Sequence, residues 1–146
     1  NLRAALEWAF TPGVPECAAG SGQGMHRRVE TGLRAVAAIP RFWNGYGYLR
    51  EGAGWLQRGL ALSEGCDPAV CADALGVLGW LVNMLGDTPR AKQLQLQSLE
   101  LFRACGDERG MAEALDTLGD SAWFERAYDE ARQYYGEGLA LRRRLV

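Results

Sequence analysis

The sequence predicts an all-α fold, a solenoid of antiparallel helix pairs with about seven helices. The main evidence is a pattern of apolar and small residues that returns after 40 residues. The first copy consists of Leu75, Leu78, Gly79, Ala91, Leu99 and Leu101, and the second of Leu115, Leu118, Gly119, Ala131, Leu139 and Leu141. A weaker copy lies 39 residues upstream, at Val36, Ile39, Gly52, Leu60 and Leu62. A period between 20 and 50 residues indicates a solenoid, in which each unit buries its apolar face against its neighbours.

The chain starts with a predicted helix and a predicted loop. Residues 1–10 place Leu2, Leu6 and Ala9 on one face of a helix. Residues 11–25 hold two prolines and four glycines, too many for a regular element, and we expect a loop there.

The first repeat is the least regular. Its leading helix contains Pro40, which lacks an amide hydrogen and is expected to kink the helix. Gly45 and Gly47 flank the following turn, and a partner helix is expected over about residues 48–63.

Capping residues punctuate the later repeats more clearly. Asp67 is a predicted N-cap before Pro68, Thr88-Pro89 begins the next helix in the same way, and Asp107 caps the third repeat. We expect Gly86 and Gly106 to end helices, because glycine adopts positive φ without strain. The chain is therefore predicted to be one domain of five segments: residues 1–10, 11–25, 26–65, 67–106 and 107–146.

Composition argues against several classes of partner. The chain has 146 residues, 48% of them hydrophobic, and a net charge of −2, which gives no reason to expect nucleic acid or an anionic membrane as the main partner. No apolar run approaches the length of a membrane span. The four cysteines match no zinc pattern and are interpreted as thiols of a cytoplasmic protein, with a Cys66–Cys71 disulfide as the alternative. Both ends fall inside helical patterns, so a piece of a longer polypeptide is expected.

The third repeat resembles the tetratricopeptide repeat (TPR) residue by residue. The matching positions are Leu115, Leu118, Gly119, Tyr128, Ala131, Tyr135, Leu139 and Leu141. The second repeat has Gln95 where an aromatic residue is usual, and Arg126 stands where a turn glycine is expected. The resemblance implies a right-handed superhelix.

Repeats of 39–40 residues are longer than the minimal TPR unit. They resemble the TPR-like region of bacterial regulators that combine a STAND-type ATPase with LuxR-type or SARP-type DNA-binding domains. The segments at residues 41–43 and 55–62 are similar to the first repeat of that family. Neither the ATPase signature nor a basic recognition helix occurs in this sequence, so the resemblance concerns the repeat region alone.

The TPR resemblance also implies a ligand groove, because the first helix of each pair lines the concave face. The groove positions with side chains suited to binding are Arg34, Arg41, Asn44, Asp73, Trp80, Asn83, Met84, Glu113, Asp116, Asp120, Trp123 and Phe124. Aromatic residues away from the core stripe favour interfaces. The alternatives are that Trp80 and Trp123 pack between helices and that the acidic stripe is an ordinary solvated face. A peptide is expected to place basic or N-terminal groups near the third repeat and acidic groups near Arg34 and Arg41.

No catalytic pattern occurs in the sequence. The single histidine, His26, has no nucleophile or carboxylate beside it, and no metal-binding or cofactor-binding motif is present. We therefore expect a non-enzymatic module without metal or cofactor, whose partner is a protein or peptide. The alternative is a structural module that forms homo-oligomers through exposed end repeats.

Overall fold

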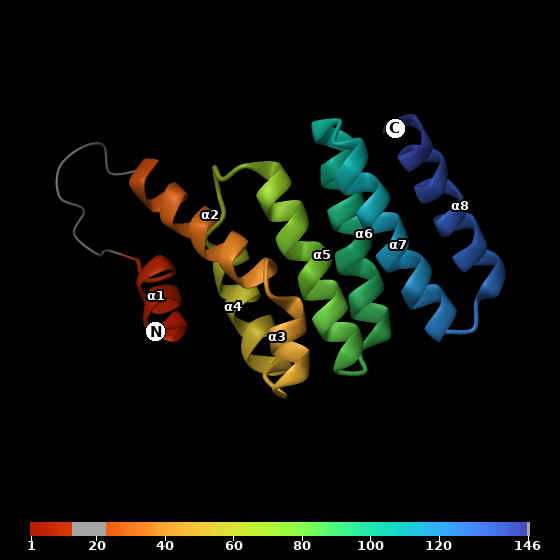
Figure 1. Cartoon of the computed structure of the whole chain (residues 1–146). Helices are drawn as coiled ribbons and strands as arrows, with labels where there is room; N and C mark the ends of the chain where they lie inside the picture. The colour runs from red at the N-terminus through yellow and green to blue at the C-terminus, as the bar shows by residue number, and fades with distance from the viewer. Residues whose placement is uncertain (13–22, 146) are drawn as a thin grey trace.

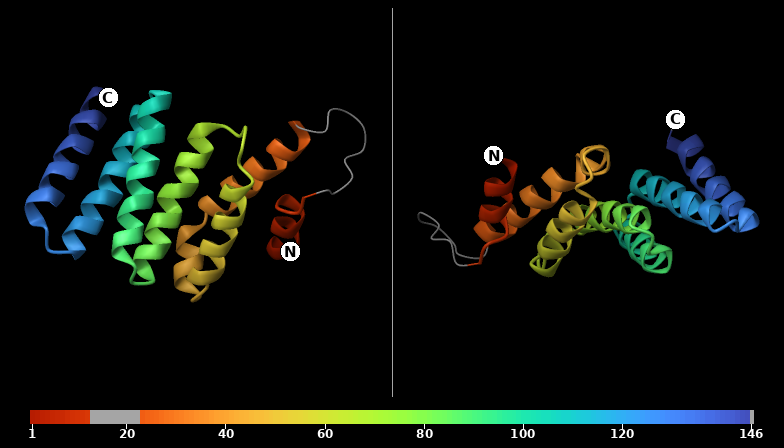
Figure 2. Two further views of the ribbon diagram at one scale, coloured as in Figure 1. Left: turned by 180° about the vertical axis from the view of Figure 1, so that it is seen from behind. Right: turned by 90° about the horizontal axis from the view of Figure 1, so that it is seen from below.

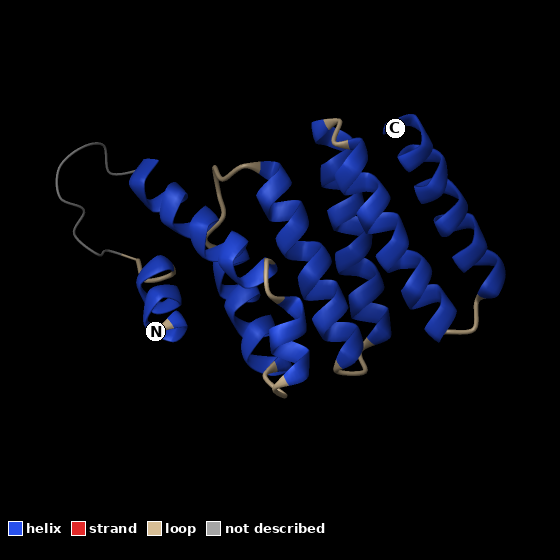
Figure 3. Ribbon diagram, in the orientation of Figure 1, coloured by secondary structure: helices blue, strands red, loops and turns tan. Residues whose placement is uncertain are grey.

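The computed structural model describes residues 1–12 and 23–145, and in this part of the chain it contains helices and no strand (Figures 1 and 3). The eight helices are α1 (Leu2–Ala9), α2 (Gln23–Ala37), α3 (Pro40–Gly45), α4 (Leu49–Ala61), α5 (Pro68–Met84), α6 (Thr88–Cys105), α7 (Glu108–Phe124) and α8 (Tyr128–Leu145). The predicted all-α solenoid is confirmed, with one helix more than expected.

The helices stand side by side as antiparallel pairs in a curved row (Figures 1 and 2). The pairs α5–α6 and α7–α8 make the most extensive contacts. In addition, α2 packs against α5 and α5 against α7, whereas α4–α6 and α6–α8 make no contacts of that extent. The first helices of the pairs therefore lie closer together than the second helices, which places them on the inner side of the curve.

An aspartate caps the start of each of the helices α5, α6 and α7. The side chain of Asp67 accepts a hydrogen bond from the amide of Ala69, at 2.9 Å, and Asp107 accepts one from Gly110, at 3.0 Å. Both predicted caps are confirmed. Between them the prediction was off by one residue, because Asp87, and not Thr88, caps α6 through the amide of Arg90.

Two boundaries in the first repeat differ from the prediction. Pro40 does not kink a continuous helix: α2 ends at Ala37, and Pro40 is the first residue of the short helix α3. Proline disfavours helical geometry in the residue before it, and its own φ suits a helix start. The second difference is that α2 begins at Gln23, inside the segment predicted as a loop; residues 13–22 of that segment lie outside the described residues.

Part of the larger core cluster lies where α1, α2 and α4 meet. Phe10 is completely buried at this junction. A Cβ atom placed on Gly32 of α2 or Gly59 of α4 would lie 2.7 or 2.8 Å from its ring. Only glycine permits this approach, so the leading helix is an integral part of the domain. A smaller cluster joins the last two pairs, with Leu99, Phe102, Ala114, Leu115 and Leu118 among its members.

The described cysteines are free thiols. Cys66, Cys71 and Cys105 form no disulfide, so the alternative of a Cys66–Cys71 bridge is not realised. Burial raises the pKa of the Cys66 thiol. Cys17 lies outside the described residues.

Candidate functional site

A hollow of about 300 Å³ opens between the first helices of the three repeats. Val70 and Val77 of α5 provide apolar walls, and three charged side chains stand around them. The seven lining residues are Arg34, Ala37, Ala38, Val70, Asp73, Val77 and Glu113. The structure thus brings together three predicted groove residues, one from each of α2, α5 and α7.

The concave hollow is lined by one positively charged side chain, Arg34, and two negatively charged ones, Asp73 and Glu113. The guanidinium of Arg34 lies 3.9 Å from the carboxylate of Asp67. Glu113 lies 3.8 Å from Arg109 on its own helix, and both side chains are well exposed. Exposed pairs of this kind are worth little, at roughly 0–1 kcal/mol. These charges are therefore held only loosely and can be exchanged for those of a ligand.

Asp73 stands in the least favourable electrostatic surroundings of the hollow. Desolvation is the largest cause that raises the pKa of its carboxyl group, followed by the nearby carboxylates of Glu113 and Asp107. The guanidinium of Arg34 acts in the opposite direction but does not compensate. A carboxylate in this situation gains from any cation that enters the hollow.

The acidic stripe expected along α7 is interrupted by α8. Asp116 accepts two hydrogen bonds from the guanidinium of Arg142, one of them at 3.0 Å, and Asp120 accepts one from the hydroxyl of Tyr135 at 2.7 Å. Burial and the hydrogen bond to Asp120 raise the pKa of Tyr135 to about 12. Both aspartates are thus occupied within the third repeat and do not line the hollow. This corrects the expectation of one continuous acidic surface formed with Glu113.

The predicted groove residues near the end of α5 also lie away from the hollow. Trp80 is half-buried and packs against the larger core cluster, as its alternative interpretation proposed. Asn83 is half-buried, and its backbone carbonyl accepts a hydrogen bond from the amide of Gly86 at 2.9 Å. The side chain of Met84 is exposed.

The remaining predicted residues are exposed on two separate surfaces. Arg41 and Asn44 belong to α3, which is a separate helix from α2, and they therefore do not continue the helix face that carries Arg34. Trp123 and Phe124 end α7, with exposed fractions of 58% and 65%. The ring of Trp123 meets that of Tyr128 edge to face, with centroids 5.0 Å apart.

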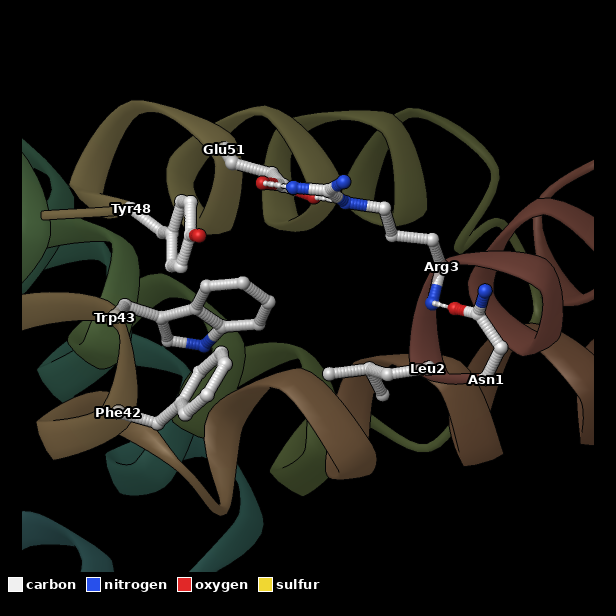
Figure 4. A pocket seen from close by; sticks show the side chains of 7 residues that line it. All are labelled: Asn1, Leu2, Arg3, Phe42, Trp43, Tyr48 and Glu51. Carbon is white, nitrogen blue, oxygen red and sulfur yellow. Dashed lines mark hydrogen bonds and ion pairs between the residues drawn. The ribbon is translucent and has the colours of Figure 1, made fainter. Parts of the chain in front are cut away.

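Sequence reasoning missed a second hollow, of about 280 Å³, between α1, α3 and α4. Figure 4 shows Arg3 reaching across it to Glu51, with aromatic rings on one side and Leu2 on the other. Arg3 donates to both carboxylate oxygens of Glu51, at 2.6 and 2.8 Å. Its hydrogen bonds raise the pKa of Arg3 and lower that of Glu51. The aromatic lining consists of Phe42, Trp43 and Tyr48.

The signal for this aromatic hollow is only half present in the sequence. The adjacent Phe42 and Trp43 are visible there as large side chains, but the pairing of Arg3 with Glu51 spans 48 residues. No periodic pattern predicts such a contact. Since both oxygens of Glu51 are already bound, the concave hollow remains the better candidate for a ligand.

Two features are absent from the described residues. These residues contain no cluster of three or more histidine, cysteine, aspartate or glutamate side chains arranged to hold a metal ion. Within residues 1–12 and 23–145, no helix combines the length and apolar character needed to cross a membrane.

Comparison with known proteins supports the fold and no more. No family model matches the sequence, and no curated protein matches it. Among solved structures, the chain is similar to BtubC (BKLC) from P. vanneervenii, with a TM-score of 0.76 and 17% sequence identity. The match covers 99% of this chain and 55% of the BtubC chain, so the chain spans about half the length of that protein. At this identity the likeness concerns the helical arrangement alone.

Proposed function

We propose that this chain is a protein–protein interaction or effector-sensing module of the TPR type, from a bacterial cytoplasmic signalling or transcriptional regulator. In this proposal a peptide or a neighbouring domain binds in the concave hollow. The observation that carries the proposal is the convergence of Arg34, Asp73 and Glu113 from three successive first helices around one hollow. The repeat positions of these three residues alone predict that they share the concave face, and all three line the hollow.

The charges define the chemistry of the proposed ligand. Asp73 and Glu113 lie on the α5–α7 side of the hollow, and Asp107 adds to the negative potential there. A free amino terminus or a basic side chain would relieve this repulsion. Arg34 on the α2 side would receive an acidic group. The ligand class is therefore a peptide with a basic or amino-terminal group at one end and a carboxylate toward the other.

The hollow lies on helices rather than loops, which favours recognition. Helix α5 packs against both α2 and α7, so the three charged residues are positioned before a ligand arrives. Preorganisation lowers the entropy cost of binding. A ligand bridging α2 and α7 would also favour one curvature of the solenoid, which offers a route to a linked domain.

The second candidate function is a structural or oligomerisation module without a dedicated ligand. Exposed aromatic rings at the α7–α8 end favour it, since Trp123, Phe124 and Tyr128 are all more than half exposed. Isolated monomers rarely leave such residues together on the surface.

A peptide library tests the first candidate. The probe is an immobilised set of heptapeptides, synthesised with either free or acetylated amino termini and with basic or acidic first residues. We expect the chain to retain peptides with free amino termini and basic first residues. The double variant Asp73→Asn with Glu113→Gln should lose this preference. Glu100→Gln is the matched control, because Glu100 is an exposed carboxylate on α6, away from the hollow.

Three outcomes would count against the proposal. They are equal retention of free and acetylated peptides, an unchanged preference in the double variant, and the same loss in the Glu100→Gln control. Circular dichroism of each variant establishes that the helical fold is intact.

A further inference from the structure

The outer face of α8 is the uncovered counterpart of a buried interface elsewhere in the molecule. The 40-residue period places Leu139 at the position of Leu99 and Tyr135 at the position of Gln95. The side chain of Leu99 is 2% exposed, because α7 covers that side of α6, and Leu139 is 48% exposed. Gln95 is 1% exposed and accepts a hydrogen bond from Ser121 of α7, whereas Tyr135 is 36% exposed. Equivalent residues of α6 and α8 therefore differ in exposure, because a neighbouring helix covers this side of α6 and none covers it on α8.

This outer face of α8 is concave as well as apolar. It holds a hollow of about 450 Å³, whose lining includes the edge-to-face pair of Trp123 and Tyr128. The lining residues are Trp123, Tyr128, Ala131, Arg132, Tyr135, Gly136 and Leu139. Covering apolar surface of this kind is favourable, because it removes that surface from water.

The charges specify what covers it. At the buried interface, the ammonium of Lys92 on α6 binds Glu130 at 2.7 Å and lies 4.0 Å from Glu125. Both carboxylates flank the turn of the next helix pair, and the hydrogen bond to Glu130 raises the pKa of Lys92. The period places Arg132 of α8 at the position of Lys92. Among the described residues, Arg132 has no ion-pair partner.

We propose that the outer face of α8 docks a helix pair of a partner protein, with apolar residues over Leu139 and a carboxylate at its turn beside Arg132. The geometry is that of α7–α8 on α6, displaced by one repeat. This surface is separate from the concave hollow, so the two sites can be occupied together.

A second copy of the chain does not fit this face. Its own acidic turn is engaged, because Glu125 and Glu130 already bind Lys92. If the α8 faces of two copies met, the exposed Arg132 and Arg143 of one copy would lie opposite Arg132 and Arg143 of the other. Like charges at close range disfavour that pairing. The isolated chain is therefore expected to be monomeric.

The test supplies the missing helix pair as a defined probe. Residues 107–146 are duplicated at the carboxyl end of the full chain, with Val146→Gly at the junction to reproduce Gly106, whose φ is 70°. Urea unfolding followed by circular dichroism is compared between the native and the extended chains. In the extended chain, Leu139→Ala should reduce the folding equilibrium constant by more than about thirtyfold, as for a buried leucine. Arg132→Ala should reduce it by about two- to fivefold.

The matched controls lie in the same two proteins. In the native chain, Leu139→Ala should reduce the constant by less than about fivefold, and Arg132→Ala should have no effect. In the extended chain, the copy's own counterpart of Leu139 becomes the exposed end, so its replacement by alanine should be equally mild.

Defined results would overturn the proposal. One is an appended copy that adds no helix, and another is a Leu139→Ala effect of the same size in both chains. A third is a concentration-dependent dimer of the native chain in sedimentation equilibrium that Leu139→Asp abolishes, since a second copy would then be the occupant.

Discussion

The helix pairs α5–α6 and α7–α8 follow one sequence pattern but differ in the number of helices that pack against them. Helix α6 buries five residues because α5 and α7 both pack against it, whereas the equivalent helix α8 packs against α7 and buries only Ala131 and Gly138. Small residues recur with the period at the contact between the helices of each pair: Gly79 lies against Gln95, and Gly119 lies against Tyr135. The difference shows that the repeat determines how two helices pair, while the neighbours determine which of its outer residues are buried.

The sharpest test of this comparison is the pair of equivalent leucines in the native chain. Leu99→Ala should lower the free energy of unfolding by about 2–5 kcal/mol, because it removes buried methyl groups and leaves a cavity. Leu139→Ala should lower it by less than about 1 kcal/mol, because that side chain is half exposed. Urea unfolding measures both, and equal losses would show that burial does not differ between the two repeats.

Replacing a glycine of α7 or a glycine of α8 by alanine should change the stability by a smaller amount, with opposite signs for the two helices. A Cβ atom on Gly110 would lie 2.2 Å from the ring of Phe102, so Gly110→Ala should cost about 1–3 kcal/mol. A Cβ atom on Gly136 meets nothing within 4 Å. Gly136→Ala should therefore stabilise the protein by about 0.5–1 kcal/mol, since glycine is unfavourable inside a helix. Melting temperatures that move in the same direction for both variants would contradict this contrast.

The turns of the two pairs offer a third comparison. Gly86 and Arg126 occupy equivalent positions, with φ values of 92° and 63°. A left-handed conformation costs a residue with a side chain about 1–2 kcal/mol. We expect Gly86→Ala to destabilise by about that amount, and Arg126→Gly to stabilise by about 0.5 kcal/mol after the greater freedom of unfolded glycine is subtracted. Thermal unfolding of the two variants checks the opposite signs, and a destabilised Arg126→Gly variant would refute the assignment of strain.

The smallest expected effect is a difference in stability between variants of the two acidic residues of the concave hollow, Asp73 and Glu113. Because the folded protein raises the pKa of Asp73 above its ordinary 3.8, ionised Asp73 lowers stability at neutral pH. Asp73→Asn should raise the urea midpoint at pH 7, and the gain should disappear as the pH falls below 3.8. Glu113, its counterpart in the third repeat, contributes to the raised pKa of Asp73 but also lies beside Arg109. Glu113→Gln should therefore raise the midpoint less than Asp73→Asn does, because it removes this repulsion together with the ion pair to Arg109. A gain for Asp73→Asn that persists at pH 3 would have another origin.

Much of the fold could be predicted because it follows from local rules. The period located the helix pairs, and the caps at Asp67 and Asp107 were visible as residue types beside a helical pattern. The break at Pro40 was misplaced because proline is compatible with both a kinked helix and a helix start. The choice between them depends on packing, including the indole of Trp43, which donates to the carbonyl of Val36 at 3.1 Å.

The candidate site was predicted less completely, for a different reason. Repeat positions identify the first helices and the face that looks inward, which sufficed for Arg34, Asp73 and Glu113. They do not tell which carboxylates a neighbouring helix neutralises. Arg142 lies 26 residues beyond Asp116 and reaches it only because α8 folds back along α7. Side-chain pairing across helices therefore has to be read from the structure.

The most direct test of the central claim is to map where a selected peptide contacts the protein. Amide chemical shifts of the ¹⁵N-labelled chain are recorded while the free-amino-terminus heptapeptide best retained in the library screen is added. We expect the shifted amides to cluster around Arg34, Asp73 and Glu113, and we expect Asp73→Asn with Glu113→Gln to remove the shifts. Shifts that cluster instead around the aromatic hollow of Phe42 and Tyr48, or along the outer face of α8, would contradict it.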